Sequence, residues 1–250
     1  VNSLPEAPID LETVKKSAEN ADTAIISLGR SSGEWFDIPT VKGGYFLTDI
    51  EEELLKNVTS CFKKTVLILN YSGVMDITFA ERYNIDAIVY TSMGGEETGN
   101  SVADILVGNV SPSGKLTDSW CKLDDYITND NITELSIPYN EGIFVGYRYF
   151  DTFGIDPVYP FGFGLSYTDF DINVKGVSVE KTCVNIDVEV KNVGNFKGKE
   201  VVQVYLSEPE GKLPKAYQQL ATFKKTTELG VGETENLNLS FDITDFAGFD

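Results

Sequence analysis

The sequence predicts two domains of different class: an α/β sandwich, with a mostly parallel sheet and helices on both faces, followed by an all-β sandwich. Two observations support this fold class. As far as Gly108, short continuous apolar runs alternate with helical patterns, which is typical of parallel strands buried on both faces. From about Asp169, apolar residues recur with a period of two and turns are frequent. We therefore expect one domain over residues 1–168 and a second over residues 169–250.

The predicted α/β domain follows from apolar runs and helix signals taken in order. Its strands are expected at 23–28, 65–69 and 87–90, and its helices at 10–21, 48–61, 75–83 and 98–106. The helix at 48–61 begins with a capping box, because the Thr48 hydroxyl can bond the amide three residues on and Glu51 can reach back. An irregular loop then extends to about Asn140, and the run 144–150 predicts a further strand.

The predicted β-sandwich rests on segments in which apolar and polar residues alternate cleanly. These segments are Val184–Val190, Val202–Leu206 and Leu237–Phe241. They are too few for a seven-stranded sandwich, so we expect this domain to be incomplete, with a final edge beyond Asp250. The stretch 159–167, which is dense in aromatic residues and glycine, is expected to pack at the junction of the two domains.

The net charge excludes some classes of partner. The chain carries 39 acidic and 20 basic residues, a formal charge of −19. Such a surface repels phosphate backbones, so we expect no nucleic-acid binding, and it disfavours anionic membranes. Neutral substrates such as sugars remain compatible with it.

The absence of histidine restricts the chemistry. With no histidine in 250 residues, Ser-His-Asp and Cys-His catalysis and histidine metal sites are excluded. Proton transfer near neutral pH then falls to carboxylates, tyrosine, lysine or cysteine. We expect no metal and no cofactor.

The cysteines and the start of the chain bear on where in the cell the protein is found. Cys61, Cys121 and Cys183 are far apart and form no CxxC pair, which favours unpaired thiols in a reducing compartment. No signal peptide and no membrane-length apolar run is visible, so a cytoplasmic location is favoured. The chain begins with Val1, so we expect a processed product or an excised fragment.

The candidate site is the loop 29–37, which follows the predicted strand 23–28. It holds two glycines, one arginine and two carboxylates. Ligands of open α/β sheets bind outside the carboxyl ends of the strands, which makes this loop a better candidate for a site than for core. From spacing alone, Glu34 is either a catalytic proton donor and acceptor or a solvated loop acid. Arg30 would anchor the loop through carboxylate or backbone contacts, or would contact substrate.

Three stretches resemble glycoside hydrolase family 3, the β-glucosidase and β-xylosidase group. Ser32–Asp37 (SGEWFD) resembles the family's SGEGxD loop. The segment 142–167, with GIFVGYRYFD and YPFGFGLSY, resembles its EGIFVGYRYF…YPFGYGLSYT segment. The segment 191–205 resembles the start of its fibronectin type III-like domain. The middle stretch is long and specific, whereas SGE alone would be a weak signal.

The resemblance implies how a catalytic site would be divided. It implies that Glu34 is the general acid/base of a retaining glycosidase, and that the nucleophile is an aspartate in a (β/α)8 barrel. No stretch here resembles the barrel, and Asp118, although it precedes Ser-Trp, lies in the GKLT segment and is not expected to be the nucleophile. The implied partners are β-linked glucosides or short oligosaccharides and a barrel domain or chain. A homo-oligomer is left open.

The neighbours of Glu34 have implied roles and include departures from the family pattern. Trp35, Phe36, Asp37 and Arg30 are the candidate substrate-binding residues, and Trp35 or Phe36 would stack on a sugar. Asp37 is more readily a residue that orders the loop than a catalyst. Trp35 and Ile38 replace a glycine and an arginine of the family pattern. Similar replacements occur in members whose sandwich precedes the barrel, so we expect a barrel downstream of Asp250.

The function expected from the sequence is part of a retaining β-glucosidase. Two alternatives remain at this point. One is a β-xylosidase on the same scaffold, since the barrel sets the first sugar subsite. The other is a non-catalytic carbohydrate-binding or scaffold module.

Overall fold

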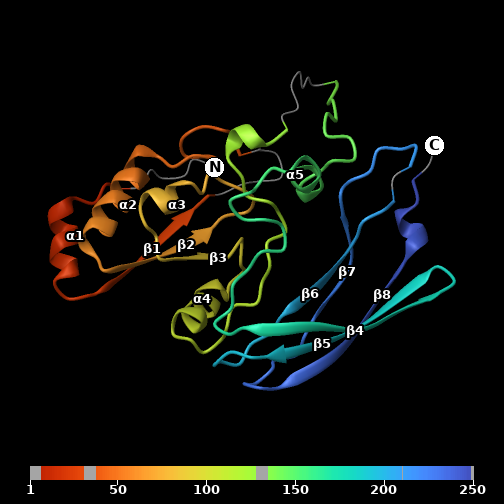
Figure 1. The fold of residues 1–250 in the computed structure, drawn as a ribbon. Coiled ribbons are helices and arrows are strands. Elements are labelled where there is room, and N and C mark those ends of the chain that lie inside the picture. Colours follow the sequence, from red (N-terminus) through yellow and green to blue (C-terminus); the bar gives the residue numbers. More distant parts are fainter. Residues whose placement is uncertain (1–6, 31–37, 128–134, 210, 249–250) are drawn as a thin grey trace. The chain divides into compact units, whose positions relative to one another are not determined.

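The computed structural model describes residues 7–30, 38–127, 135–209 and 211–248, and Figure 1 shows its elements along the chain. The chain divides into two compact units. One unit runs through Val102 and includes Trp120–Tyr126, and the other contains Ala103–Ser119 and the part from Ile127 onward. The domain boundary expected at 168/169 stays a prediction.

The first unit is built on a parallel sheet, as predicted. Its strands β1 (Thr23–Gly29), β2 (Lys64–Asn70) and β3 (Ala87–Tyr90) pair in the order β1-β2-β3, all parallel. Leu67 in the central strand is fully buried, and Leu28 and Leu69 are almost so. Because parallel strands end at the same edge, the segments after Gly29, Asn70 and Tyr90 all leave the sheet on one side.

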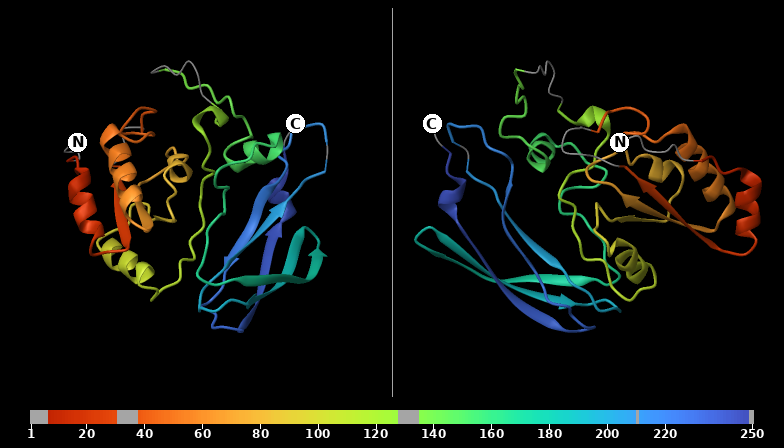
Figure 2. Two further views of the ribbon diagram at one scale, coloured as in Figure 1. Left: turned by 60° about the vertical axis from the view of Figure 1, so that its left-hand side comes forward. Right: turned by 180° about the vertical axis from the view of Figure 1, so that it is seen from behind.

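The helices of this unit match the predicted positions, with two shorter than expected. They are α1 (Leu11–Ala18), α2 (Asp49–Cys61), α3 (Phe79–Arg82) and the first part of α4 (Thr98–Leu106), which continues into the other unit, with a short 3₁₀ turn η1 (Leu123–Asp125). Helices α1 and α2 pack side by side, and α2 contacts β2 (Figures 1 and 2). No helix within the described ranges is long and apolar enough to cross a bilayer.

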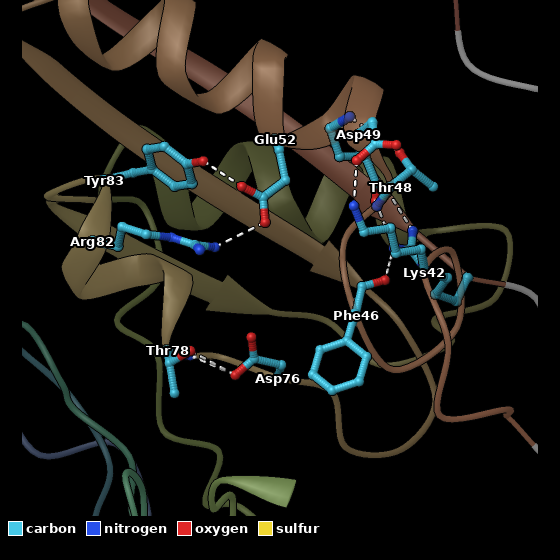
Figure 3. Close-up of polar contacts among 11 residues, drawn as sticks. Lys42, Phe46, Thr48, Asp49, Glu52, Asp76, Thr78, Arg82 and Tyr83 are labelled. Carbon is cyan, nitrogen blue, oxygen red and sulfur yellow. Dashed lines mark hydrogen bonds and ion pairs between the residues drawn. The ribbon is translucent and has the colours of Figure 1, made fainter.

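The late start of α3 has a local cause. The Asp76 carboxylate accepts bonds from the backbone amide of Thr78, at 3.1 Å, and from its hydroxyl, at 2.8 Å (Figure 3). This turn competes with the helical conformation at the positions where the sequence pattern predicted helix. Helix α3 therefore begins only at Phe79, whose side chain is fully buried.

The expectation of a strand at 144–150 is wrong, because the chain there forms α5 (Tyr147–Phe153). Gly146 precedes the helix with φ of 59° and Gly154 ends it in the left-handed region, so the two glycines bracket one short helix. Helical spacing also brings the rings of Tyr149 and Phe153 to 5.0 Å from each other, and Phe150 is buried. The preference of aromatic residues for strands is thus outweighed by the glycines at the two helix ends and by side-chain packing.

The second unit contains two antiparallel sheets, as expected of a β-sandwich. One sheet has the order β4-β5-β8, with β4 (Phe170–Glu180), β5 (Cys183–Asn192) and β8 (Thr234–Asp242). The other pairs β6 (Val201–Leu206) with β7 (Gln219–Lys225), and a 3₁₀ turn η2 (Ile243–Phe246) follows β8. The core combines Leu229, from the segment between β7 and β8, with residues of both sheets: Ile186, Val188, Val190, Val202, Leu237 and Leu239.

A bulge in β4 keeps its apolar residues on the core face. Val174 pairs with Val188, and Val177 pairs with Ile186, with a register shift between Val174 and Gly176. Lys175 is the extra residue, so the apolar residues that face the core have even numbers before it and odd numbers after it. Val174 and Val177 are nevertheless 64% and 63% exposed, and they line a groove of about 430 Å³ between the sheets.

A buried amide, Asn192, joins several loops of this unit. Its Oδ1 accepts from the Thr168 hydroxyl at 2.7 Å and from the Gly194 amide at 3.1 Å. Its Nδ2 donates to the carbonyls of Phe196, at 2.7 Å, and Leu229, at 2.9 Å. Both donors and both acceptor positions of the amide are used, so a fully buried polar group is fully satisfied.

Candidate active site

The candidate loop begins where β1 ends. The Arg30 amide donates to the Asn70 carbonyl at 3.2 Å, which continues the pairing of β1 with β2 by one residue. Glu34, Trp35, Phe36 and Asp37 lie outside the described residues, so their roles stay predictions. The described part of the site consists of Arg30 and the segment from Ile38 to the start of α2.

Arg30 forms a two-pronged ion pair with Glu51 in the first turn of α2. Its Nη1 and Nη2 atoms lie 2.5 and 2.6 Å from Oε1 and Oε2 of Glu51. The two side chains are only 10% and 1% exposed, so water screens the pair little. Two parallel charge-assisted bonds of this kind fix orientation as well as distance.

The remaining donors of Arg30 reach backbone carbonyls. Nε donates to Gly44 at 3.2 Å, Nη1 to Gly29 at 2.9 Å, and Nη2 to Phe46 at 3.4 Å. With the two bonds to Glu51, each of the five N–H groups of the guanidinium has an acceptor. These are anchoring contacts to carboxylate and backbone, as the sequence suggested, while a substrate contact of Arg30 stays a prediction.

The segment that receives these bonds is a compact turn. The Tyr45 amide donates to the Pro39 carbonyl at 2.9 Å, and the Gly43 amide donates to the Phe46 carbonyl at 2.9 Å. Gly43 has φ of 82°, and a Cβ on Gly44 would lie 2.2 Å from the Pro39 carbonyl oxygen. Both positions therefore require glycine.

Glu51 also completes the predicted capping box. Its backbone amide donates to the Thr48 hydroxyl oxygen at 3.1 Å, and its Oε2 accepts from the Thr48 amide at 2.7 Å. The sequence identified this capping role but missed the ion pair with Arg30. The sequence did contain a signal that Glu51 is buried and needs a partner. Glu51 lies on the same helical face as Leu55 and Val58, both of which are buried.

Polar contacts outside this anchor surround the first turns of α2 (Figure 3). Lys42 pairs with Asp49, and both side chains are exposed. Glu52 accepts from the Tyr83 hydroxyl at 2.5 Å and from Arg82 at 2.9 Å. These pairs lie closer to solvent than the Arg30–Glu51 pair and are expected to contribute little to stability.

Two buried tyrosines lie in the same unit. Burial raises the pKa of Tyr45 and of Tyr71, and the positive charge of Arg30 partly offsets this rise at Tyr71. The Tyr45 hydroxyl donates to the Cys121 carbonyl at 2.9 Å. The Tyr71 hydroxyl has no hydrogen-bond partner within the described ranges. The sequence analysis did not single out either residue.

The chain thus combines a parallel sheet, whose first strand is followed by the anchored Arg30, with two antiparallel sheets, and its α/β part matches a glycosyl hydrolase domain. The chain belongs to glycoside hydrolase family 3. Residues 7–167 match the glycosyl hydrolase family 3 C-terminal domain, and residues 200–250 match the fibronectin type III-like domain. The resemblance drawn from the sequence is confirmed.

Curated relatives of the chain are β-glucosidases. It is 43% identical to a β-glucosidase of Ruminococcus albus over 98% of this chain and 26% of that protein. It is 32% identical to thermostable β-glucosidase B of Acetivibrio thermocellus over 95% of this chain and 32% of that protein. The chain thus spans between a quarter and a third of the length of these relatives.

Solved structures of β-glucosidases have the same fold. β-Glucosidase 3B from Thermotoga neapolitana, in complex with α-D-glucose, superposes with a TM-score of 0.93 at 36% identity. The match covers all of this chain and 36% of that one. A β-glucosidase from Paenibacillus barengoltzii superposes with a TM-score of 0.94 at 37% identity, over 98% of this chain and 28% of that one.

Proposed function

We propose that this chain is the part of a retaining β-glucosidase that supplies the general acid/base, Glu34. The observation that carries the proposal is the 43% identity to a β-glucosidase over 98% of the chain. The anchored start of the Glu34 loop at the end of β1 supports it, because side chains there are presented at the edge where open α/β sheets bind ligands.

The proposed chemistry needs a second carboxylate. Retaining glycosidases hold two carboxyl groups about 5–5.5 Å apart across the scissile bond. One attacks the anomeric carbon and forms a glycosyl-enzyme, while the other protonates the leaving oxygen and then takes a proton from water. We assign the second role to Glu34. The nucleophile would be an aspartate of a (β/α)8 barrel brought by another part of the protein or by another chain.

The proposed substrates are β-linked glucosides or short oligosaccharides. The names of the relatives favour glucosides over xylosides. Trp35 and Phe36 would stack on a sugar ring, and Asp37 would order the loop. No histidine is available for the proton transfers, which leaves them to carboxylates.

The direct test is Glu34→Ala in the protein that contains both this chain and the barrel. We expect kcat/KM for cellobiose to fall by about 100- to 10,000-fold, because that leaving group needs a proton. With 2,4-dinitrophenyl β-D-glucoside, whose leaving group does not need protonation, azide should raise kcat by replacing the base-activated water. Unchanged hydrolysis of cellobiose by the folded variant would refute the assignment.

A further inference from the structure

The buried pair Arg30–Glu51 stands next to both ends of the segment 31–37. At the first end, the amide of Arg30 is held by Asn70 of β2. At the other end, the Pro39 carbonyl is held by the Tyr45 amide, and the adjoining Gly44 carbonyl accepts from Nε of Arg30 at 3.2 Å. A single guanidinium therefore connects the residue before the segment to the turn that follows it.

Glu51 transmits this connection to a rigid element. Its carboxylate bonds both Arg30 and the Thr48 amide, and it belongs to the first turn of α2. The positions of β1, the turn at 43–46 and α2 are thus linked through one carboxylate. Contacts that join several elements in this way fix the direction of a loop more firmly than a contact within the loop itself.

Stability alone gives a weak account of this pair. Burying an ion pair costs desolvation that its attraction barely offsets, and apolar replacements of similar volume often leave stability unchanged or higher. What a bidentate pair supplies is a defined distance and angle. The Glu52–Arg82 pair, whose glutamate lies on the same helix, joins the same two residue types with more exposure, and its side chains make no hydrogen bond to residues 38–48 among the contacts described.

We infer that Arg30 and Glu51 are positioning residues for the proposed glycosidase site: their ion pair sets where the acid/base loop leaves the sheet and where it returns. The inference rests on the proposed function of Glu34. In this role both residues act through the loop and not on the reacting atoms. Their effect is on the proton transfer, because a displacement of about 1 Å in a catalytic group can cost about 100-fold in rate.

The experiment compares two substrates in the protein that contains the barrel. Cellobiose needs protonation of its leaving oxygen, whereas 2,4-dinitrophenyl β-D-glucoside does not, and kcat/KM reports the steps through glycosyl transfer in both cases. The variants are Arg30→Lys, which keeps the charge but loses the fork, and Glu51→Gln, which keeps an oxygen for the Thr48 amide. The matched controls are Arg82→Lys and Glu52→Gln, and Glu34→Ala is the reference.

We expect Arg30→Lys and Glu51→Gln to lower the ratio of kcat/KM for cellobiose to kcat/KM for the dinitrophenyl glucoside by about 10- to 100-fold. The controls should change the ratio by less than about twofold, because their pair is outside the anchor. The ratio does not depend on the folded fraction, since both substrates sample the same active molecules, so a purely structural loss lowers both values together.

The outcomes separate the two claims. If Glu34→Ala lowers the ratio and the Arg30 and Glu51 variants leave it at the value of the controls, the positioning role is overturned and the acid/base assignment stands. If Glu34→Ala leaves the ratio unchanged, the assignment of Glu34 is overturned, and the positioning role with it.

Discussion

At the scale of single residues, two buried tyrosines offer a comparison that only the structure could suggest. Tyr45 and Tyr71 are 5% and 1% exposed, and burial raises the pKa of both, so both hydroxyls remain neutral around pH 7. They differ in hydrogen bonding: Tyr45 donates to Cys121, whereas the Tyr71 hydroxyl is unpaired within the described part of the chain. A buried hydroxyl without a partner costs free energy.

We predict opposite effects of removing the two hydroxyls. Tyr45→Phe should lower the free energy of unfolding by about 1 kcal/mol, because it leaves the Cys121 carbonyl without its donor. Tyr71→Phe should leave it unchanged or raise it, because no bond is lost. Urea unfolding followed by tryptophan fluorescence measures both. A loss at Tyr71 equal to that at Tyr45 would show that the Tyr71 hydroxyl does have a partner.

The residues of the candidate site were only partly accessible from the sequence. The anchoring contacts of Arg30 could be anticipated, because a buried strand that ends in arginine leaves a charge near the core. Its partner could not be identified, since Glu51 is 21 residues away and already had a local function as a cap. Pairing across such a distance depends on how β1 and α2 pack, which no local pattern encodes.

At the scale of elements, the start of α2 combines two functions in a few residues. Thr48 caps the helix, and Glu51 serves both the cap and the ion pair. The capping contribution can be separated from the ion pair, because a change at Thr48 removes the hydroxyl but leaves the Glu51 carboxylate in place.

We predict that Thr48→Ala lowers the free energy of unfolding by about 1 kcal/mol, since the Glu51 amide loses its acceptor. Thr59→Ala, in the interior of the same helix, is the control and should be neutral or slightly stabilising, because alanine is the better helix former. Thermal unfolding by circular dichroism compares the two variants. Equal losses at Thr48 and Thr59 would contradict the capping contribution.

Two elements that the sequence failed to predict, β4 and α5, share a physical cause. Strand β4 changes the parity of its apolar residues at Lys175, so a strict period of two breaks in the middle of the strand. Helix α5 is rich in aromatic residues that favour strands, yet it lies between two glycines with positive φ. In both cases the backbone conformation at single residues determines the structure. A prediction from the spacing of apolar residues does not detect such positions.

At the scale of the whole molecule, the sequence predicted the two fold classes from the change in period alone. What it could not show is how completely the second sheet covers the first. The core-facing residues Val174 and Val177 of β4 remain more than half exposed, and Val179 is 61% exposed. Apolar surface of this kind on an edge strand promotes association.

We predict that the isolated chain self-associates as its concentration rises, through the core-facing side of β4. Val174→Lys combined with Val177→Lys should reduce association, measured by sedimentation velocity over a range of concentrations. Asn173→Lys combined with Ser178→Lys adds the same charge to the opposite face of the strand and is the control. If the two double variants reduce association equally, charge and not the apolar face is responsible.

The amide nitrogen of Asn192 makes the second unit sensitive to a change in one side chain. Slow hydrolysis of that side chain to aspartate, a common form of protein ageing, would replace the nitrogen that serves Phe196 and Leu229 with an oxygen. Three oxygens would then face one another in a place that water does not reach, and the loops joined there would separate. The joining of these loops therefore depends on one nitrogen atom.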